Sequence, residues 1–158
     1  MTSTPDAAAS PDTIEVGGKT YTLVPLDWRA IGQYERYMRS EIVAAGREAA
    51  ASIADVREKN TLIQQAYDAA GRLHVFSPNA VGFHSSIGGV MKLAFLSMLP
   101  NHPKITEADV YQMLRDKDVL VAVVEKIRAL NEAVFGKAEE AKTEEDAGDQ
   151  PGPKSGPA

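Results

Sequence analysis

An apolar run that ends just before two prolines constrains the fold of this chain more than any other segment. From Val90 to Leu99 nearly every residue is hydrophobic, and the run then breaks at Pro100-Asn101-His102-Pro103. Proline has no amide N–H and disrupts a helix interior, so a helix is expected to end there. We predict a helix over about Ser86 to Leu99 that is apolar on nearly every side. Such a helix lies either at the centre of a core or beneath a partner.

Residues 13–25 have the pattern of a β-hairpin. Gly17-Gly18 separates two short segments, and glycine readily adopts the positive φ angles that a two-residue turn needs. This turn pairs Val16 with Lys19 and gathers four apolar side chains on one face of the hairpin. They are Ile14, Val16, Tyr21 and Leu23. Because an isolated hairpin is marginal in water, this face must pack on helices or on another protein.

Two long helices are predicted after the hairpin. Asp27 is a good N-cap, because its carboxylate accepts hydrogen bonds from free amide N–H groups. The apolar stripe of the first helix consists of Trp28, Ile31, Tyr34, Met38 and Ile42. We expect its aromatic members to lie in the core and the helix to end near Gly46, a C-terminal cap. A second, more polar helix is predicted from about Glu48 to Ala70.

The later segments are shorter. Residues 72–86 predict an irregular connection that holds at most a short helix. Thr106 has the pattern of an N-cap for a short helix, and Asp118 is predicted to cap the last helix, whose apolar positions continue to Val134. Gly88-Gly89 predicts close helix packing, with a bend at the start of the helix as the rival interpretation.

Composition divides the 158 residues into a folded body and two polar ends. Residues 1–12 and 137–158 are predicted to be disordered, because they offer little apolar surface to offset the entropy of ordering. The acidic segment 137–158 either acts as a solvating tail or meets a basic partner. Residues 13–136 are long enough for one domain with a real core. We therefore assign a mostly α fold, a small helical domain preceded by an N-terminal β-hairpin.

Charge and residue types narrow the possible functions. The net charge of −5 comes from the two ends, whereas residues 13–136 hold 14 basic and 14 acidic residues. This neutral body argues against nucleic-acid binding, including a small helical regulator that binds DNA. With no cysteine, disulfides and thiolate metal sites are excluded. The longest apolar run is half the ~20 residues that cross a membrane, so we expect no membrane partner.

The sequence shows no constellation of catalytic residues. His74, His84 and His102 have no helical metal-binding spacing, and we expect them to have surface or capping roles. The segment His84-Ser85-Ser86 lacks a nucleophile elbow, and Gly88-Gly89 is not part of a phosphate-binding loop. We therefore expect no enzymatic activity, no cofactor and no bound metal.

Three segments are similar to the phage tail assembly chaperone family: IEVGGKTYTLVPL, LAFLSMLPNHPKITEADVYQML and the helix ending in ALNEAVFG. The resemblance covers roughly residues 13–135, and the long second helix with the Ala-rich segment 44–54 departs from it. It implies a chaperone that binds the tape measure protein, holds it soluble and brings tail tube subunits to it. It also implies location in the host bacterial cytoplasm, absence from the mature virion and, often, a second, frameshifted form.

This role predicts a surface that accepts a helix of the client. An amphipathic helix docks into an apolar groove through i, i+3, i+4 and i+7 contacts. We place the groove between the helix over 86–99 and the last helix. Its expected lining residues are Phe95, Met98, Leu99, Val123 and Ile127. The alternative for the first three is that they are internal core, and the alternative for the whole chain is a structural phage adaptor or connector retained in the virion.

Overall fold

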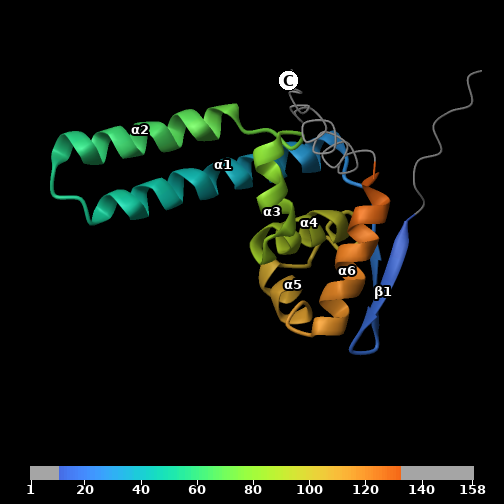
Figure 1. The fold of residues 1–158 in the computed structure, drawn as a ribbon. Coiled ribbons are helices and arrows are strands. Elements are labelled where there is room, and N and C mark those ends of the chain that lie inside the picture. Colours follow the sequence, from blue (N-terminus) through green and yellow to red (C-terminus); the bar gives the residue numbers. More distant parts are fainter. Residues whose placement is uncertain (1–10, 133–158) are drawn as a thin grey trace, which may run out of the picture.

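The computed structural model describes residues 11–132 as a β-hairpin followed by six α-helices (Figure 1). The elements in chain order are β1 (Asp12–Val16), β2 (Lys19–Leu23), α1 (Trp28–Ala51), α2 (Val56–Arg72), the 3₁₀ turn η1 (Pro78–Ala80), α3 (Val81–Ser85), α4 (Ile87–Met98), α5 (Glu107–Met113) and α6 (Lys117–Leu130). The predicted mostly α class with an N-terminal hairpin is confirmed. The predictions for Val134 and for residues 137–158 lie outside the described residues.

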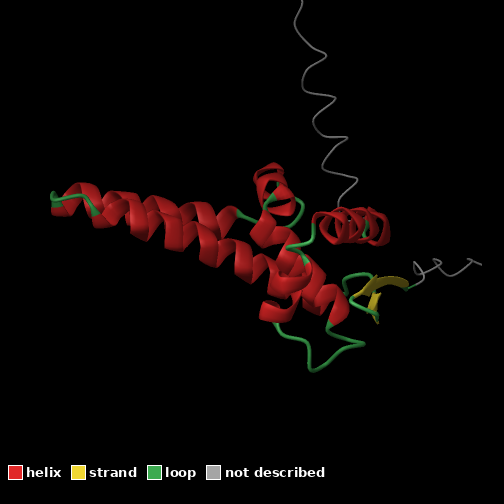
Figure 2. Ribbon diagram, turned by 90° about the horizontal axis from the view of Figure 1, so that it is seen from below, coloured by secondary structure: helices red, strands yellow, loops and turns green. Residues whose placement is uncertain are grey.

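The chain forms a body and a projecting arm. In Figures 1 and 2 the C-terminal half of α1 and the whole of α2 run side by side away from the other elements. We call this helical hairpin, residues 40–72, the arm. In the body, α4 contacts α1, α3, α5, α6 and β2, so it is the central helix. The prediction that an all-apolar helix is central or covered is resolved in favour of the centre of the core.

The hairpin has the predicted register. Val16 pairs with Lys19 and Ile14 with Tyr21, and the turn residues Gly17 and Gly18 have φ angles of 59° and 73°. Its apolar face packs on the body, and Ile14 is buried there. β1 begins at Asp12, one residue earlier than predicted, and the Asp12 carboxylate lies 2.8 Å from the Lys126 ammonium on α6.

Side chains from three separate segments hold the outer edge of β2 and the residues after it. Alternate residues of an extended strand point their N–H groups the same way, and here three such groups each donate to a side chain of the body. The pairs are Thr22 N to His102 Nε2 (2.8 Å), Val24 N to Ser97 Oγ (3.1 Å) and Leu26 N to Asn131 Oδ1 (2.8 Å). This arrangement fixes the hairpin to α4, to the loop after it and to the end of α6.

Two predicted helix boundaries are wrong. α1 does not stop at Gly46 but continues to Ala51, because that glycine makes a close contact with α2 instead of capping α1. α2 starts at Val56, where the Asp55 carboxylate accepts from the N–H groups of Arg57 and Glu58.

The caps of the shorter helices are partly as predicted. Asp116, not Asp118, caps α6, since its carboxylate accepts from the N–H of Asp118 itself. The capping pattern at Thr106 is confirmed: its hydroxyl accepts from the N–H of Asp109, whose carboxylate accepts from the N–H of Thr106. The irregular connection over 72–86 contains only the short η1 and α3, as expected.

The aromatic residues of α1 do not all lie in the core. Tyr34 is fully buried as predicted, but Trp28 is 78% exposed. Trp28 is the first residue of α1, so no preceding turn of the helix flanks it, whereas Ile31 and Tyr34 lie one and two turns further in. The close-packing interpretation of Gly88-Gly89 is confirmed, because a Cβ atom on Gly89 would lie 1.7 Å from the carbonyl oxygen of Phe83.

Candidate partner-binding surface

The groove predicted between α4 and α6 is filled by its own lining residues. Met98 and Val123 are fully buried and Ile127 is nearly so, because α4 and α6 pack directly on each other. Phe95 and Leu99 are half-buried. The core alternative therefore holds for Met98, and the predicted groove residues Val123 and Ile127 are also internal core, so none of the three is exposed to a client helix.

A charged side chain, that of Lys92, lies over the ring of the half-buried Phe95. The Lys92 ammonium lies 5.4 Å from the ring centre of Phe95 and 5.9 Å from that of Tyr37, which is within cation–π range. The same ammonium forms an ion pair with Glu107 at the start of α5. Burial, with Glu41 and Glu107 nearby, raises the pKa of the Tyr37 hydroxyl. This face is therefore a polar seam between α1, α4 and α5.

The histidines have structural contacts. His84 Nε2 lies 3.1 Å from the carbonyl oxygen of Val75, and its Nδ1 lies 3.2 Å from the Tyr34 hydroxyl. Burial lowers the pKa of His84 and raises that of Tyr34. His102 accepts the N–H of Thr22, as described above. Within residues 11–132 no group of three or more His, Asp or Glu side chains is placed to hold a metal ion.

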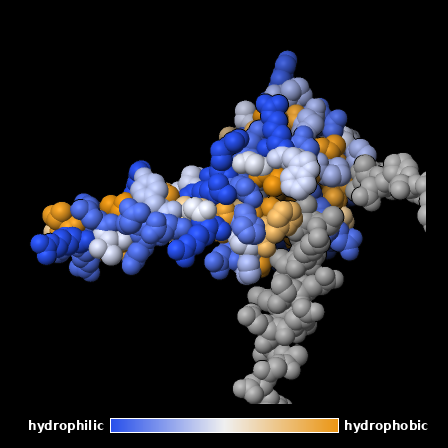
Figure 3. Space-filling model, turned by 90° about the horizontal axis from the view of Figure 1, so that it is seen from above, coloured by the Kyte–Doolittle hydropathy of each residue, from blue (hydrophilic) through white to orange (hydrophobic). Residues whose placement is uncertain are grey.

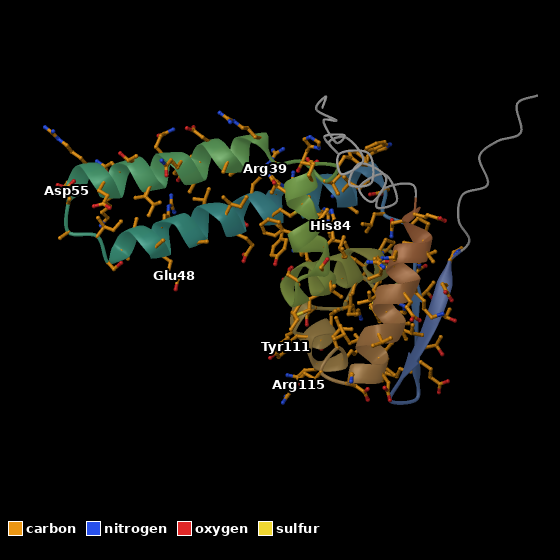
Figure 4. All side chains as sticks on the ribbon, in the orientation of Figure 1. Arg39, Glu48, Asp55, His84, Tyr111 and Arg115 are labelled. Atoms are coloured by element: carbon orange, nitrogen blue, oxygen red, sulfur yellow. The ribbon has the colours of Figure 1, made fainter. Side chains whose placement is uncertain are left out.

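A small polar network joins α1, next to the base of the arm, to the residues that follow α2. Arg39 Nε donates to the carbonyl oxygen of Leu73 (3.0 Å), and Glu35 accepts the N–H of Val75 (2.9 Å). Arg39 and Glu35 also form an ion pair at 3.6 Å. In Figure 4, Arg39 and His84 lie near the base of the arm and Asp55 lies at its tip. These contacts hold the end of α2 against the middle of α1.

The seam between the two helices of the arm is built from small residues. Ala50 and Ala70 are buried, and a Cβ atom on Gly46 would lie 2.3 Å from the Cβ of Ala66. The helices therefore approach closely at this contact, while larger apolar side chains of the arm are less well covered. Those that are only partly buried are Ile42, Val43, Ile53, Leu62 and Ile63.

Further apolar side chains on the arm are exposed. Val56 at its tip is 67% exposed and Tyr67 is 44% exposed, with the Tyr67 ring stacked beneath the Arg47 guanidinium, 5.6 Å from the ring centre. Figure 3 shows hydrophobic residues at the tip and along the arm, interspersed with hydrophilic ones. The arm thus replaces the predicted groove as the candidate partner-binding surface.

The sequence contained a signal for this arm. Val43, Gly46, Ala50 and Ile53 recur at steps of three and four, and so do the residues of α2 that face them. Because glycine is also a common C-terminal cap, the repeat and a helix end at Gly46 are both compatible with the sequence.

Comparisons of the chain with protein-family models, with curated proteins and with solved structures gave no match. Among the helices of residues 11–132, none combines the length and the apolar character needed to span a membrane.

Proposed function

We propose that this chain is a phage tail assembly chaperone, which binds the tape measure protein and helps recruit tail tube subunits during tail morphogenesis. The similarity of three segments to that family supports the proposal. The observation that carries it on structural grounds is the arm, a projecting helical hairpin whose larger apolar residues are only partly covered.

An incomplete two-helix arm suits a long helical client. A third amphipathic helix lying along the arm covers the side chains that two helices leave exposed, as in other helix-in-groove interactions. At about 100° per residue, Ile42, Ala45 and Ala49 share the flank of α1 that turns away from Tyr67. Leu62 lies on the matching flank of α2. Because alanine is small, a client helix can approach this flank closely.

Co-expression tests the proposal. This chain is tagged and produced together with the products of its neighbouring genes, and the tagged complex is purified. We expect recovery of a long helical protein that is insoluble when it is produced alone. Recovery of this chain by itself, folded and with every neighbour left behind, would reject the chaperone proposal.

Variants on the arm test where the client binds. The double variant Ala45→Glu/Ala49→Glu places two charges on the proposed client flank at exposed positions with good helix propensity. It should abolish client capture and leave the fold intact. Ala44→Glu, an exposed alanine on a different side of α1, is the matched control and should retain capture. Equal loss from both variants would contradict docking on this flank.

Mass spectrometry of purified particles separates a chaperone from a retained adaptor. A chaperone leaves before the virion is complete, so its peptides should be missing from particles that contain the tape measure and tube proteins. A stoichiometric amount of this chain in those particles would favour the structural adaptor.

A further inference from the structure

Helix α2 carries an apolar stripe that packs on α1 and, beside it, a second and mainly apolar stripe, in which Tyr67 is contacted by Arg47 of α1. The inner stripe includes the buried Ala70 and the seam residue Ala66. The second stripe, here called the outer stripe, consists of Val56, Asn60, Ile63 and Tyr67, at steps of four, three and four residues. Two of its members are among the most exposed large apolar residues of the arm. A stripe at this heptad spacing is the pattern that pairs one helix with another.

We propose that the outer stripe is a homodimer interface, in which α2 of one copy packs antiparallel against α2 of a second copy. The antiparallel arrangement sets Val56 of each copy near Tyr67 of the other and places the two bodies at opposite ends of the paired arms. Such an isologous contact closes on itself and gives a dimer, not a chain of molecules.

Charge along α2 favours a second copy in this orientation. Arg57 and Asp68 project from the same edge of the outer stripe, one near each end of α2. Antiparallel pairing brings Arg57 of each copy opposite Asp68 of the other, which makes two attractive contacts. Parallel pairing places the two copies of each charged residue on opposite edges of the interface, so neither attractive contact forms.

The area of one helix face predicts a weak dimer. α2 has 17 residues, a length of about 25 Å, and a single helix is about 10 Å wide. A face of that size covers roughly 250 Å² on each copy, or roughly 500 Å² in total, below the usual size of stable protein interfaces. The dimer should therefore form only at high concentration and dissociate on dilution.

Sedimentation of the full chain over a range of concentrations tests the interface. The wild-type mass should approach twice that of one chain at high concentration and fall toward one chain on dilution. Val56→Glu should raise the dissociation constant at least tenfold. Ile87→Glu is the matched control, because Ile87 is also the first residue of a helix and is 68% exposed against 67% for Val56. It should leave the dimer unchanged.

A charge exchange tests the orientation. Arg57→Glu alone should weaken the dimer, because it places two acidic groups opposite each other, and the double variant Arg57→Glu/Asp68→Arg should restore it. A wild-type chain that stays monomeric at every concentration overturns the proposal. A dimer that Val56→Glu leaves intact overturns it too, and so does an equal weakening by Val56→Glu and by the control Ile87→Glu. Failure of the double variant to restore association overturns the antiparallel arrangement. The client flank of α1 is tested by separate variants. If a monomeric chain captures the client, the dimer proposal is rejected and the proposed chaperone function is not affected.

Discussion

Gly46 and Ala66 mark the closest approach of the two helices of the arm, since a Cβ atom on Gly46 would lie only 2.3 Å from the Cβ of Ala66. Real Cβ atoms do not approach so closely, so a side chain at position 46 must push α1 and α2 apart. The contact explains why a glycine sits inside a 24-residue helix. Glycine there lowers helix propensity, and the arm gains close packing in exchange.

Replacement of Gly46 by alanine should therefore destabilise the protein, although alanine is the better helix former. Gly32 in the same helix provides the control, because a Cβ atom there meets nothing within 4 Å. Gly32→Ala should raise the free energy of unfolding by up to about 1 kcal/mol. Urea denaturation, monitored by circular dichroism, measures the free energy of unfolding of both variants.

A second substitution tests whether the Gly46 effect comes from this contact. Ala66→Gly removes the opposing Cβ, so the double variant Gly46→Ala/Ala66→Gly should be more stable than the sum of the two single effects predicts. Additive effects would show that the strain lies elsewhere.

Gly89 should tolerate a side chain even less well. Its Cβ position lies 1.7 Å from the Phe83 carbonyl oxygen, and a backbone atom cannot turn aside as a flexible side chain can. We expect Gly89→Ala to lower the melting temperature sharply by separating α3 from α4. Gly82→Ala, at a position in α3 with open space, should leave the melting temperature almost unchanged. A small effect at Gly89 would contradict the close packing of these helices.

Elements specified by neighbouring residues were predictable from the sequence. The hairpin depends on Gly17-Gly18 and the alternation around it, and the start of α1 depends on the Asp27 carboxylate, which accepts the N–H of Ala30 at 2.7 Å. The capping box at Thr106 is equally local. Such features need only a few residues in sequence, and their physics does not change when the rest of the chain folds.

Features that depend on distant segments were not predictable. In the sequence alone Gly46 fits a C-terminal helix cap, and only the fold places it against Ala66. Trp28 is the first member of the apolar stripe of α1, and the body does not cover it. An all-apolar helix such as α4 does not reveal which residues its neighbours bury, so the sequence leaves open whether Met98 lines a groove or lies in the core, where the structure places it. For the same reason, no local pattern connects Ser97 with the chain after β2.

Ser97 should contribute more to stability than an exposed serine does. Its hydroxyl donates to the carbonyl oxygen of Val24 at 2.6 Å and accepts the N–H of the same residue, and the side chain is fully buried. Ser97→Ala removes the hydrogen-bond donor to this partly buried carbonyl, so a loss of about 1 kcal/mol in the free energy of unfolding is expected. Ser40→Ala is the control, because its hydroxyl also donates to a carbonyl oxygen but is exposed. Similar losses at both positions would contradict the proposed anchor.

His84 should make stability depend on pH near neutrality. Burial lowers its pKa below the ordinary value of 6.5, so the folded state binds this proton less readily than the unfolded state. The stability gained from neutral His84 is therefore fully present above about pH 6.5 and is lost as the pH falls through the lower pKa of the folded state. The pKa values of Asp12 and Asp109 are also lowered, but from 3.8, so these groups stay charged throughout this window.

Replacement of His84 by glutamine isolates this effect. The glutamine amide can donate to the Val75 carbonyl and accept from the Tyr34 hydroxyl, but it does not titrate. Urea midpoints measured between about pH 7.5 and pH 5, on either side of the ordinary histidine pKa, should fall less in His84→Gln than in the wild type. His74→Gln, at an exposed position, should keep the wild-type dependence. If His84→Gln retains the full fall in the urea midpoint, another group causes that fall, and the protonation of His84 does not set the pH dependence of stability.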